Sequence, residues 1–288
     1  MGEAEGEAAD ILELNAPATL CGRRCDQALW NYSKLIPDRG APQGQRRVGR
    51  SREGRGRERV EHCMPEVIFN GPAGRLEGRY QAGPEKDAPI AMILHPHPAF
   101  GGTMNNPIVY QLYYMFKERG FTVLRFNFRS IGRSQGEFDY GVGELSDAAA
   151  ALDWVQSLHP DSKRCWVAGY SFGAWIGMQL LMRRPEVEGF ISISPQPNSY
   201  DFSFLAPCPS SGLIIHGSAD KVAPPEAVQT LVDKLHTQKG IVITQNTMEG
   251  ANHFYSEHTP QLLEACADYL DARARGELVA EPRPRRGR

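Results

Sequence analysis

The sequence predicts an α/β fold built on a mostly parallel, twisted sheet with helices on both faces. Short apolar runs that suit buried parallel strands recur along the chain, and helical segments alternate with them. Pro or Gly marks the ends of many of these segments. Strands that alternate with helices imply right-handed crossovers, which cover both faces of a sheet. Such sheets bind their substrates at the carboxyl ends of the strands, so functional residues are expected in the loops there.

The first half of the predicted domain follows this alternation element by element. The run P-I-A-M-I-L-H predicts a buried strand over residues 89–95, and a helix over 107–120 ends at Gly120 as a C-cap. The run F-T-V-L-R-F-N-F predicts a strand over 121–128, followed by an Ala- and Leu-rich helix over 144–158. The run R-C-W-V-A-G then predicts a strand over 164–169.

The second half repeats the pattern. A helix over residues 172–184 is stopped by Pro185. The remaining apolar runs predict strands at 189–194, 212–216 and 240–245, and the remaining periodic segments predict helices at 225–238 and 260–273.

Composition and charge exclude several classes of protein. Of 288 residues, 41% are hydrophobic and 23% are charged, and the net charge of −2 gives no overall attraction to nucleic acid or membrane. No apolar stretch of about 18 residues predicts a membrane span. Six scattered cysteines and an acidic start without an apolar signal region fit a reduced, cytoplasmic protein. Composition and charge do not exclude a homo-oligomer.

The candidate nucleophile is a serine in a G-x-S-x-G pattern, which occurs twice. Gly169-Tyr-Ser171-Phe-Gly173 has a strand running in and a helix running out, as a nucleophile turn requires. The helix N-terminus also directs its positive end at this serine. Gly132-Arg-Ser134-Gln-Gly136 lies in a glycine-rich loop with no helix after it. Ser171 is therefore the predicted nucleophile, and Ser134 is the rival that this context rejects.

These motifs resemble those of the α/β-hydrolase superfamily. The loop N-F-R-S-I-G-R-S-Q-G at 127–136 resembles its D-x-R-G-x-G-x-S-x-G segment, with Asn127 in place of Asp and Ser130 in place of Gly. The run H-P-H-P-A-F-G-G at 95–102, together with G-Y-S-F-G-A, is similar to small bacterial dienelactone-hydrolase-like and esterase-like members. The resemblance implies the α/β-hydrolase fold and a serine hydrolase that needs no cofactor.

The resemblance divides the chain into three parts. It assigns residues 64–275 to the catalytic domain. Residues 1–63 include an Arg-rich run from Arg46 to Arg59 that cannot bury enough apolar surface to offset ordering, so a disordered extension is expected. A basic arm for an acidic partner is the alternative interpretation. The Pro- and Arg-rich residues 276–288 are expected to form a flexible basic tail.

The family order of Ser, then Asp or Glu, then His selects the remaining triad members. His253 follows a predicted strand and precedes the last helix, where the resemblance places the catalytic histidine; His258 is the alternative. Asp220 lies in H-G-S-A-D-K-V-A-P, which resembles the H-G-x-x-D-x-x-V-P signature of the acid. A helix-capping or turn role is the competing interpretation of Asp220.

The oxyanion hole is expected to use two backbone N–H groups. Phe172 follows the nucleophile and supplies the first, and the family's H-G-x-x-G loop aligned on His97 makes Ala99 the second donor, with Phe100 as the alternative. His95 and His97 could instead bind a metal, but two ligands flanked by prolines make a poor site, so no metal is predicted.

The predicted substrate is a small acyl compound. About 17 residues separate the 189–194 strand from Gly212, so no large cap is expected. The pocket is predicted to use mainly apolar side chains, namely Phe100, Met104, Tyr170, Pro195, Val222 and Phe254. We therefore expect hydrolysis of a carboxylic ester or thioester through an acyl-enzyme. The alternatives are a small peptidase or amidase of this fold, and a non-catalytic binding module.

Overall fold

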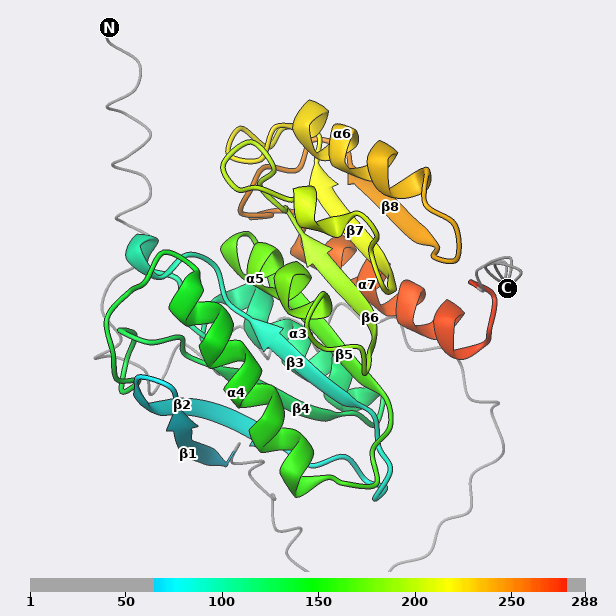
Figure 1. Ribbon diagram of the computed structural model, residues 1–288. Helices are drawn as coiled ribbons and strands as arrows, with labels where there is room; N and C mark the ends of the chain where they lie inside the picture. Colours follow the sequence, from blue (N-terminus) through cyan, green and yellow to red (C-terminus); the bar gives the residue numbers. More distant parts are fainter. Residues whose placement is uncertain (1–64, 279–288) are drawn as a thin grey trace, which may run out of the picture. The chain divides into compact units, whose positions relative to one another are not determined.

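The computed structural model describes residues 65–278 (Figure 1). The expectations for residues 1–63 and for the tail beyond residue 278 lie outside this range. Eight strands form one sheet in the order β1-β2-β4-β3-β5-β6-β7-β8. The strands are β1 (Glu66–Gly71), β2 (Gly74–Gln81), β3 (Ile90–Leu94), β4 (Thr122–Phe126), β5 (Cys165–Tyr170), β6 (Val187–Ile193), β7 (Ser211–Gly217) and β8 (Ile243–Met248).

The sheet is parallel from β4 to β8, and its first two strands are antiparallel. Strands β3, β4 and β5 are buried along their whole length. Burial on both faces explains why their sequences are continuous apolar runs rather than alternating patterns. The predicted α/β-hydrolase fold, with a mostly parallel sheet, is confirmed.

Helices cover both faces of the sheet (Figure 1). One face packs against α3 (Pro107–Glu118) and α7 (Thr259–Ala274), and the other against α4 (Val142–Leu158), α5 (Phe172–Leu181) and α6 (Pro225–His236). Two short 3₁₀ turns, η1 (Pro98–Phe100) and η2 (Ser203–Leu205), lie in loops after β3 and β6. Two apolar cores therefore sandwich the sheet and hold its carboxyl-end loops in place.

Three strands at the edges of the sheet differ from the sequence-based expectation. The hairpin β1–β2 was not predicted, because its strands carry many polar and charged residues and pair only at the antiparallel edge. Strand β8 begins at Ile243 rather than at residue 240, since Gly240 has φ +84° and pairing with β7 starts at Gly212 and Ile243. The polar residues of β8 are tolerated because this strand is the other edge of the sheet.

The loop after β4 is held by buried polar contacts. The Arg129 guanidinium donates two hydrogen bonds to Asp147 on α4, at 2.9 and 2.8 Å, and the Arg129 N–H donates a third. The Ser134 hydroxyl accepts from the Glu77 N–H (3.0 Å) and donates to the Asn127 carbonyl (2.7 Å). This second G-x-S-x-G serine therefore has a structural role, joining the loop to the edge of the sheet.

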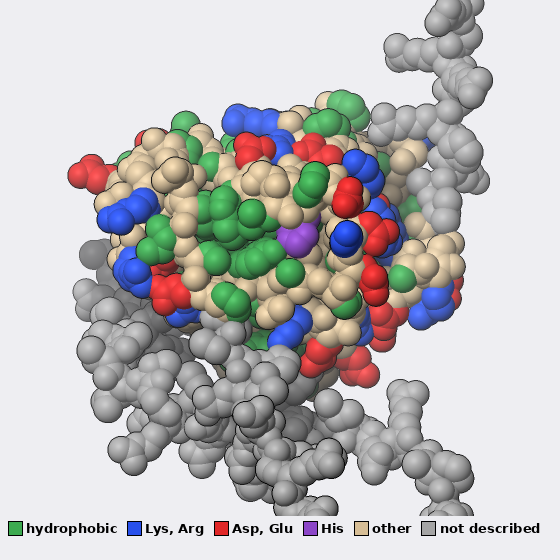
Figure 2. Space-filling model, turned by 90° about the horizontal axis from the view of Figure 1, so that it is seen from below, with side chains coloured by type: hydrophobic (Ala, Val, Ile, Leu, Met, Phe, Trp, Pro, Cys, Tyr) green, Lys and Arg blue, Asp and Glu red, His purple; other side chains and the backbone are tan. Residues whose placement is uncertain are grey.

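Hydrophobic side chains also reach the surface. Figure 2 shows a group of them beside a histidine on the face seen from below, with charged side chains around it. Surface apolar area of this kind is ordinary for a folded domain. Within residues 65–278, no helix is both long and apolar enough to cross a membrane.

We predict that Asp147→Asn destabilises the domain by about 3–5 kcal/mol, because it leaves the buried Arg129 charge without its carboxylate. Urea unfolding would measure the change. Asp153→Asn is the matched control, since the Asp153 side chain is 65% exposed in its ion pair with Arg184. It should cost less than about 1 kcal/mol. Equal losses in the two variants would contradict the importance of the buried pair.

Candidate active site

The turn between β5 and α5 holds Ser171 in a strained conformation. Ser171 has φ 58° and ψ −115°, and the helix begins at the next residue. A Cβ on Gly169 would lie 2.3 Å from the Gly173 carbonyl oxygen, and one on Gly173 would lie 2.4 Å from that of Leu94. Both positions therefore require glycine, which explains the G-x-S-x-G pattern in this turn. Left-handed backbone at a non-glycine residue is typical of functional sites.

The structure brings together the three predicted triad residues. His253 Nε2 lies 3.1 Å from Ser171 Oγ, and His253 Nδ1 lies 2.8 Å from Asp220 Oδ2. The three residues come from the ends of β5 and β7 and from the loop before α7, and each is at most 6% exposed. This is the geometry that a serine nucleophile, its base and the group that orients the base require.

Hydrogen bonds to the Asp220 carboxylate keep it ionised. Burial raises the pKa of this carboxyl, but His253, the Ala223 N–H and the Ser194 hydroxyl outweigh burial and lower it. Both Val222 and Ala223 donate their N–H groups to Asp220 Oδ1 at 2.8 Å. Asp220 therefore plays both roles considered for it. Its Oδ1 caps the following turn, and its Oδ2 binds His253.

The other histidines have different partners. His216 Nε2 contacts Thr247 Oγ1 (3.0 Å), and His236 Nε2 contacts the Ile243 carbonyl (3.0 Å). His258, the alternative base, is the N-cap residue of α7. Among the described histidines, His253 is thus the one placed against both Ser171 and Asp220.

The loop after β3 is organised by two histidine rings. His95 is fully buried; its Nδ1–H donates to the Pro96 carbonyl (2.6 Å), and its Nε2 accepts from the Phe128 N–H (3.0 Å). Burial lowers the pKa of His95 to about 4, so the ring is neutral at pH 7. His97 Nδ1 accepts from the Ala99 N–H (3.1 Å). These contacts occupy three of the four ring nitrogens, and no group of three or more metal-ligating side chains occurs within residues 65–278.

The two predicted candidates for the second oxyanion donor have hydrogen-bond acceptors within their own loop. The Ala99 N–H is bound to the His97 ring, and the N–H of the alternative, Phe100, donates to the His97 carbonyl (3.1 Å). Both groups face the loop's own acceptors because Pro98–Phe100 forms a 3₁₀ turn capped by His97. Within the described chain, the N–H of His97 itself donates no hydrogen bond.

The six predicted pocket residues divide into two sets. Met104, Tyr170 and Pro195 are buried, and the Tyr170 hydroxyl donates to the His253 carbonyl (2.7 Å), so it supports the histidine loop. Phe100, Val222 and Phe254 are 71%, 40% and 45% exposed. Each exposed residue contacts or neighbours a site residue: Phe100 packs on His97, Val222 donates to Asp220, and Phe254 follows His253.

Beside the triad lies an aromatic wall, which consists of His97, Phe100, Phe138, Tyr140 and Phe172. The His97 ring lies 4.8–4.9 Å from the rings of Phe100, Phe138 and Phe172, and Phe138 contacts Tyr140 at 5.1 Å. Phe100 and Tyr140 are 71% and 81% exposed. Phe138 and Tyr140 were not predicted as site residues, since nothing in their local pattern separates them from ordinary loop residues.

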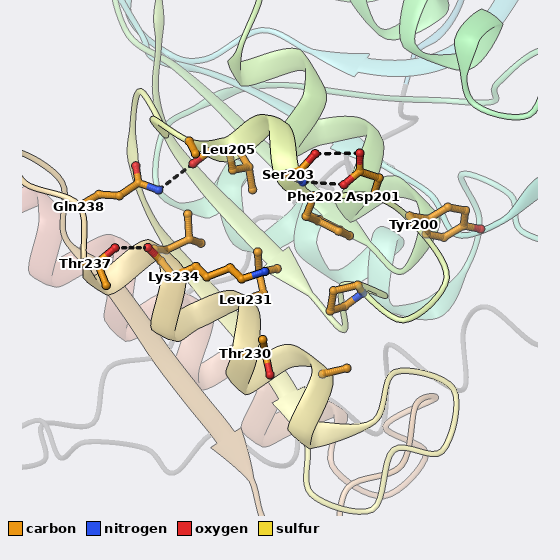
Figure 3. A pocket seen from close by; sticks show the side chains of 14 residues that line it. Tyr200, Asp201, Phe202, Ser203, Leu205, Thr230, Leu231, Lys234, Thr237 and Gln238 are labelled. Atoms are coloured by element: carbon orange, nitrogen blue, oxygen red, sulfur yellow. Dashed lines mark hydrogen bonds between the residues drawn. The ribbon is translucent and has the colours of Figure 1, made fainter.

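A cavity of about 570 Å³ lies beside α6 (Figure 3). None of the triad residues lines it. Its polar groups bind one another: Asp201 accepts from the Ser203 N–H and hydroxyl, and Gln238 donates to the Leu205 carbonyl. Tyr200 lines the cavity and also packs on Phe172 at 5.9 Å. The cavity is therefore a neighbour of the site rather than its centre.

The chain is similar to several known proteins. The X-Pro dipeptidyl-peptidase (S15) family matches residues 81–209. An uncharacterised protein of Rickettsia prowazekii is 50% identical over 72% of this chain and 89% of its own. A lysophosphatidylserine lipase of Xenopus tropicalis is 24% identical over 73% of this chain, which spans 65% of the lipase.

Two solved structures are also similar to this chain. A putative α/β hydrolase from Agrobacterium tumefaciens is 78% identical, with a TM-score of 0.75, over 76% of this chain and all of its own. A serine hydrolase without a lid from Xanthomonas campestris is 34% identical, with a TM-score of 0.65, over 76% of this chain and 96% of its own.

The fold and the arrangement of its loops define an α/β hydrolase. The chain belongs to the α/β-hydrolase family, and the solved structures that it resembles include serine hydrolases of this family.

We predict that the buried His95 makes the domain less stable in mild acid. The pKa of His95 is about 4 in the folded state and 6.5 in the unfolded chain. Between these two pH values the ring is protonated in the unfolded chain and neutral in the folded state. Stability should therefore fall by about 3 kcal/mol as the pH drops from 6.5 to about 4. His95→Gln keeps an acceptor but no titrating ring, so its unfolding free energy should depend less on pH. An unchanged slope in urea unfolding at several pH values would contradict this.

Proposed function

We propose that this protein hydrolyses a carboxylic ester or thioester through an acyl-enzyme on Ser171. The observation that carries the proposal is the hydrogen-bonded series from Ser171 through His253 to Asp220. Ser171 attacks the acyl carbonyl while His253 takes the proton of its hydroxyl and passes it to the leaving group. Water, activated by the same histidine, then releases the acid. Asp220 holds the histidine tautomer whose Nε2 faces the nucleophile.

The N–H groups of Phe172 and His97 are proposed as the oxyanion hole. Phe172 is the first residue of α5, whose leading N–H groups have no acceptor within the helix. His97 lies in the loop that follows β3, and its ring packs on the Phe172 ring at 4.9 Å. The contacts of Ala99 and Phe100 within their own turn support His97 as the second donor in place of those two residues.

The surface around the triad supports an apolar acyl or alkyl group in the substrate. Phe100, Val222 and Phe254 surround the site and are exposed, so a bound apolar group would cover them. The name of the lipase relative also points to esters. The buried thiols of Cys165 and Cys266, whose pKa burial raises to about 12, fit the reducing cytoplasm expected from the sequence.

A peptidase is the second candidate function. The match to the X-Pro dipeptidyl-peptidase family over residues 81–209 favours it, and this range includes Ser171 but neither Asp220 nor His253. A dipeptidyl peptidase must bind the charged amino terminus of its substrate. Phe100, Val222 and Phe254, three exposed residues beside the triad, are apolar and suit an acyl or alkyl group better than a charged ammonium group. The ester is therefore the better-supported substrate.

We predict that Ser171→Ala lowers kcat/KM for p-nitrophenyl butyrate by at least about 10³-fold, because the nucleophile is lost. Release of p-nitrophenol measures the rate, and a fluorophosphonate probe should label the wild type but not the variant. Ser134→Ala is the matched control: it removes the other G-x-S-x-G hydroxyl and should remain labelled. The same assay with Gly-Pro-p-nitroanilide tests the peptidase candidate.

Three outcomes of this assay would contradict the proposal. Full activity of Ser171→Ala would exclude the triad. Faster turnover of the anilide than of every ester would favour the peptidase. A wild type that neither turns over substrate nor reacts with the probe would favour a non-catalytic binding module.

We predict that Phe100→Ala raises KM for p-nitrophenyl octanoate about 3–10-fold, because an exposed ring that a bound acyl chain would cover is lost. KM for p-nitrophenyl acetate should change little, since the acetyl group is short. Leu158→Ala is the control: this residue is 49% exposed at the end of α4. Equal effects on both esters would place the acyl chain elsewhere.

A further inference from the structure

The cavity beside α6 has apolar walls on two sides. Phe202 and Leu205 come from the loop that holds η2, and Leu231 and Leu235 come from α6. All four side chains are at most 7% exposed. Small-molecule sites occupy roughly 300–1,000 Å³. The cavity volume of about 570 Å³ falls in this range, so the space between the two walls suits a small ligand with an apolar part.

One cationic side chain reaches into this cavity. Lys234 extends into it from α6 (Figure 3), and it is the one Lys or Arg among the described residues of the lining. Within residues 65–278, the Lys234 ammonium group takes part in no hydrogen bond or ion pair. It is therefore the exception among the charged groups of the cavity, and its charge is available to a bound anion.

The one acidic side chain of the lining is bound elsewhere. Asp201 Oδ1 accepts from the Ser203 N–H and Asp201 Oδ2 from the Ser203 hydroxyl, both at 2.8 Å. The Asp201 carboxylate thus faces the start of η2 (Figure 3), and it forms no ion pair with Lys234. The Gln238 amide is also occupied, because it donates to the Leu205 carbonyl (2.7 Å) and accepts from the Cys208 N–H (2.6 Å).

We propose that this cavity is a second ligand site, which binds an aliphatic carboxylate. The carboxylate group contacts the Lys234 ammonium, and the aliphatic chain lies between the apolar walls. A single lysine complements a singly charged anion. Phosphate groups, in contrast, are typically held by several donors such as an Arg fork or the N–H groups at a helix start.

The site is separate from the triad but shares an aromatic neighbour with it. Tyr200 lines the cavity, stacks on Trp175 at 4.5 Å and contacts Phe172 at 5.9 Å. The Trp175 indole N–H also donates to the Asp201 carbonyl (3.0 Å). A ligand in the cavity would therefore contact a ring that packs on the nucleophile turn. Since no triad residue lines the cavity, the second site does not depend on the proposed function.

The test is calorimetric titration of the protein with octanoate, with octanamide as the neutral analogue. The wild type should bind octanoate about 3–5-fold more tightly than octanamide, because only the acid gains the solvent-exposed contact with Lys234. Lys234→Gln should bind the two about equally. Butanoate should bind at least about 10-fold more weakly than octanoate, since it buries a shorter chain.

Two further variants separate charge from space. Lys163→Gln is the matched control: Lys163 is an exposed lysine outside the cavity, its ammonium donates to the Pro160 carbonyl (3.3 Å), and the variant should bind octanoate as the wild type does. Ala227→Leu enlarges a side chain of the lining and keeps Lys234. It should therefore weaken the binding of octanoate and octanamide alike, by at least about 5-fold.

Three results would overturn the second site. One is no binding by the wild type at about 10 mM octanoate, well above a millimolar Kd. The second is an equal loss in Lys234→Gln and Lys163→Gln, which would mean a general effect of charge. The third is a loss in Phe100→Ala but none in Lys234→Gln, which would place the acid beside the triad. Full esterase activity of Ser171→Ala would instead overturn the proposed function and leave the second site intact.

Discussion

The close approach between the start of α5 and the end of β3 is the contact on which the site depends. Gly173 lies so near the carbonyl groups of Leu94 and His95 that a Cβ would come within 2.4–2.6 Å of them. This contact sets the nucleophile turn directly against the loop that begins at His95. Since Phe172 belongs to the turn and His97 to the loop, the same contact brings the two proposed oxyanion donors to one place. A larger residue at 173 would separate them.

The buried imidazole of His95 extends this contact to the next strand. Its ring joins the Pro96 carbonyl to the Phe128 N–H, so the loop after β3 is connected to the loop after β4. Arg129 follows Phe128 and binds Asp147 on α4. The polar groups beneath the site thus form a continuous support, each satisfied by a partner. Support of the loops explains why His95 and the Arg129–Asp147 ion pair are buried. Neither the proposed catalysis nor a metal site requires these groups.

Much of the fold could be predicted, and so could the meeting of Ser171, Asp220 and His253 at one end of the sheet, because both depend on local patterns with a physical cause. Apolar runs indicate buried parallel strands, and Gly169 and Gly173 mark a turn that admits no side chain. The second oxyanion donor could not be found in this way. In a loop with two prolines, the partner of each N–H depends on the 3₁₀ turn and on the His97 ring.

The strands at the edges of the sheet were also hard to predict from the sequence. Hairpin β1–β2 and strand β8 pair through backbone groups at the sheet edges, where polar side chains are tolerated and the apolar pattern is weak. The contact between Ser194 and Tyr255 could not be predicted for another reason. Ser194 ends an apolar run like any strand-terminal serine, and only the chain geometry places its hydroxyl 2.8 Å from that of Tyr255.

The strain at the site is balanced by hydrogen bonds that repeat from strand to strand. The Ser171 N–H donates to the Ile193 carbonyl on β6, and the Ser194 N–H donates to the Ile215 carbonyl on β7, both at 2.8 Å. Each left-handed residue thus continues the parallel pairing of its strand by one step before the chain turns away. Because left-handed serine costs about 1–3 kcal/mol, such a backbone persists only where its surroundings fix it. The sheet therefore positions Ser171 and Ser194 by one mechanism, used on two adjacent strands.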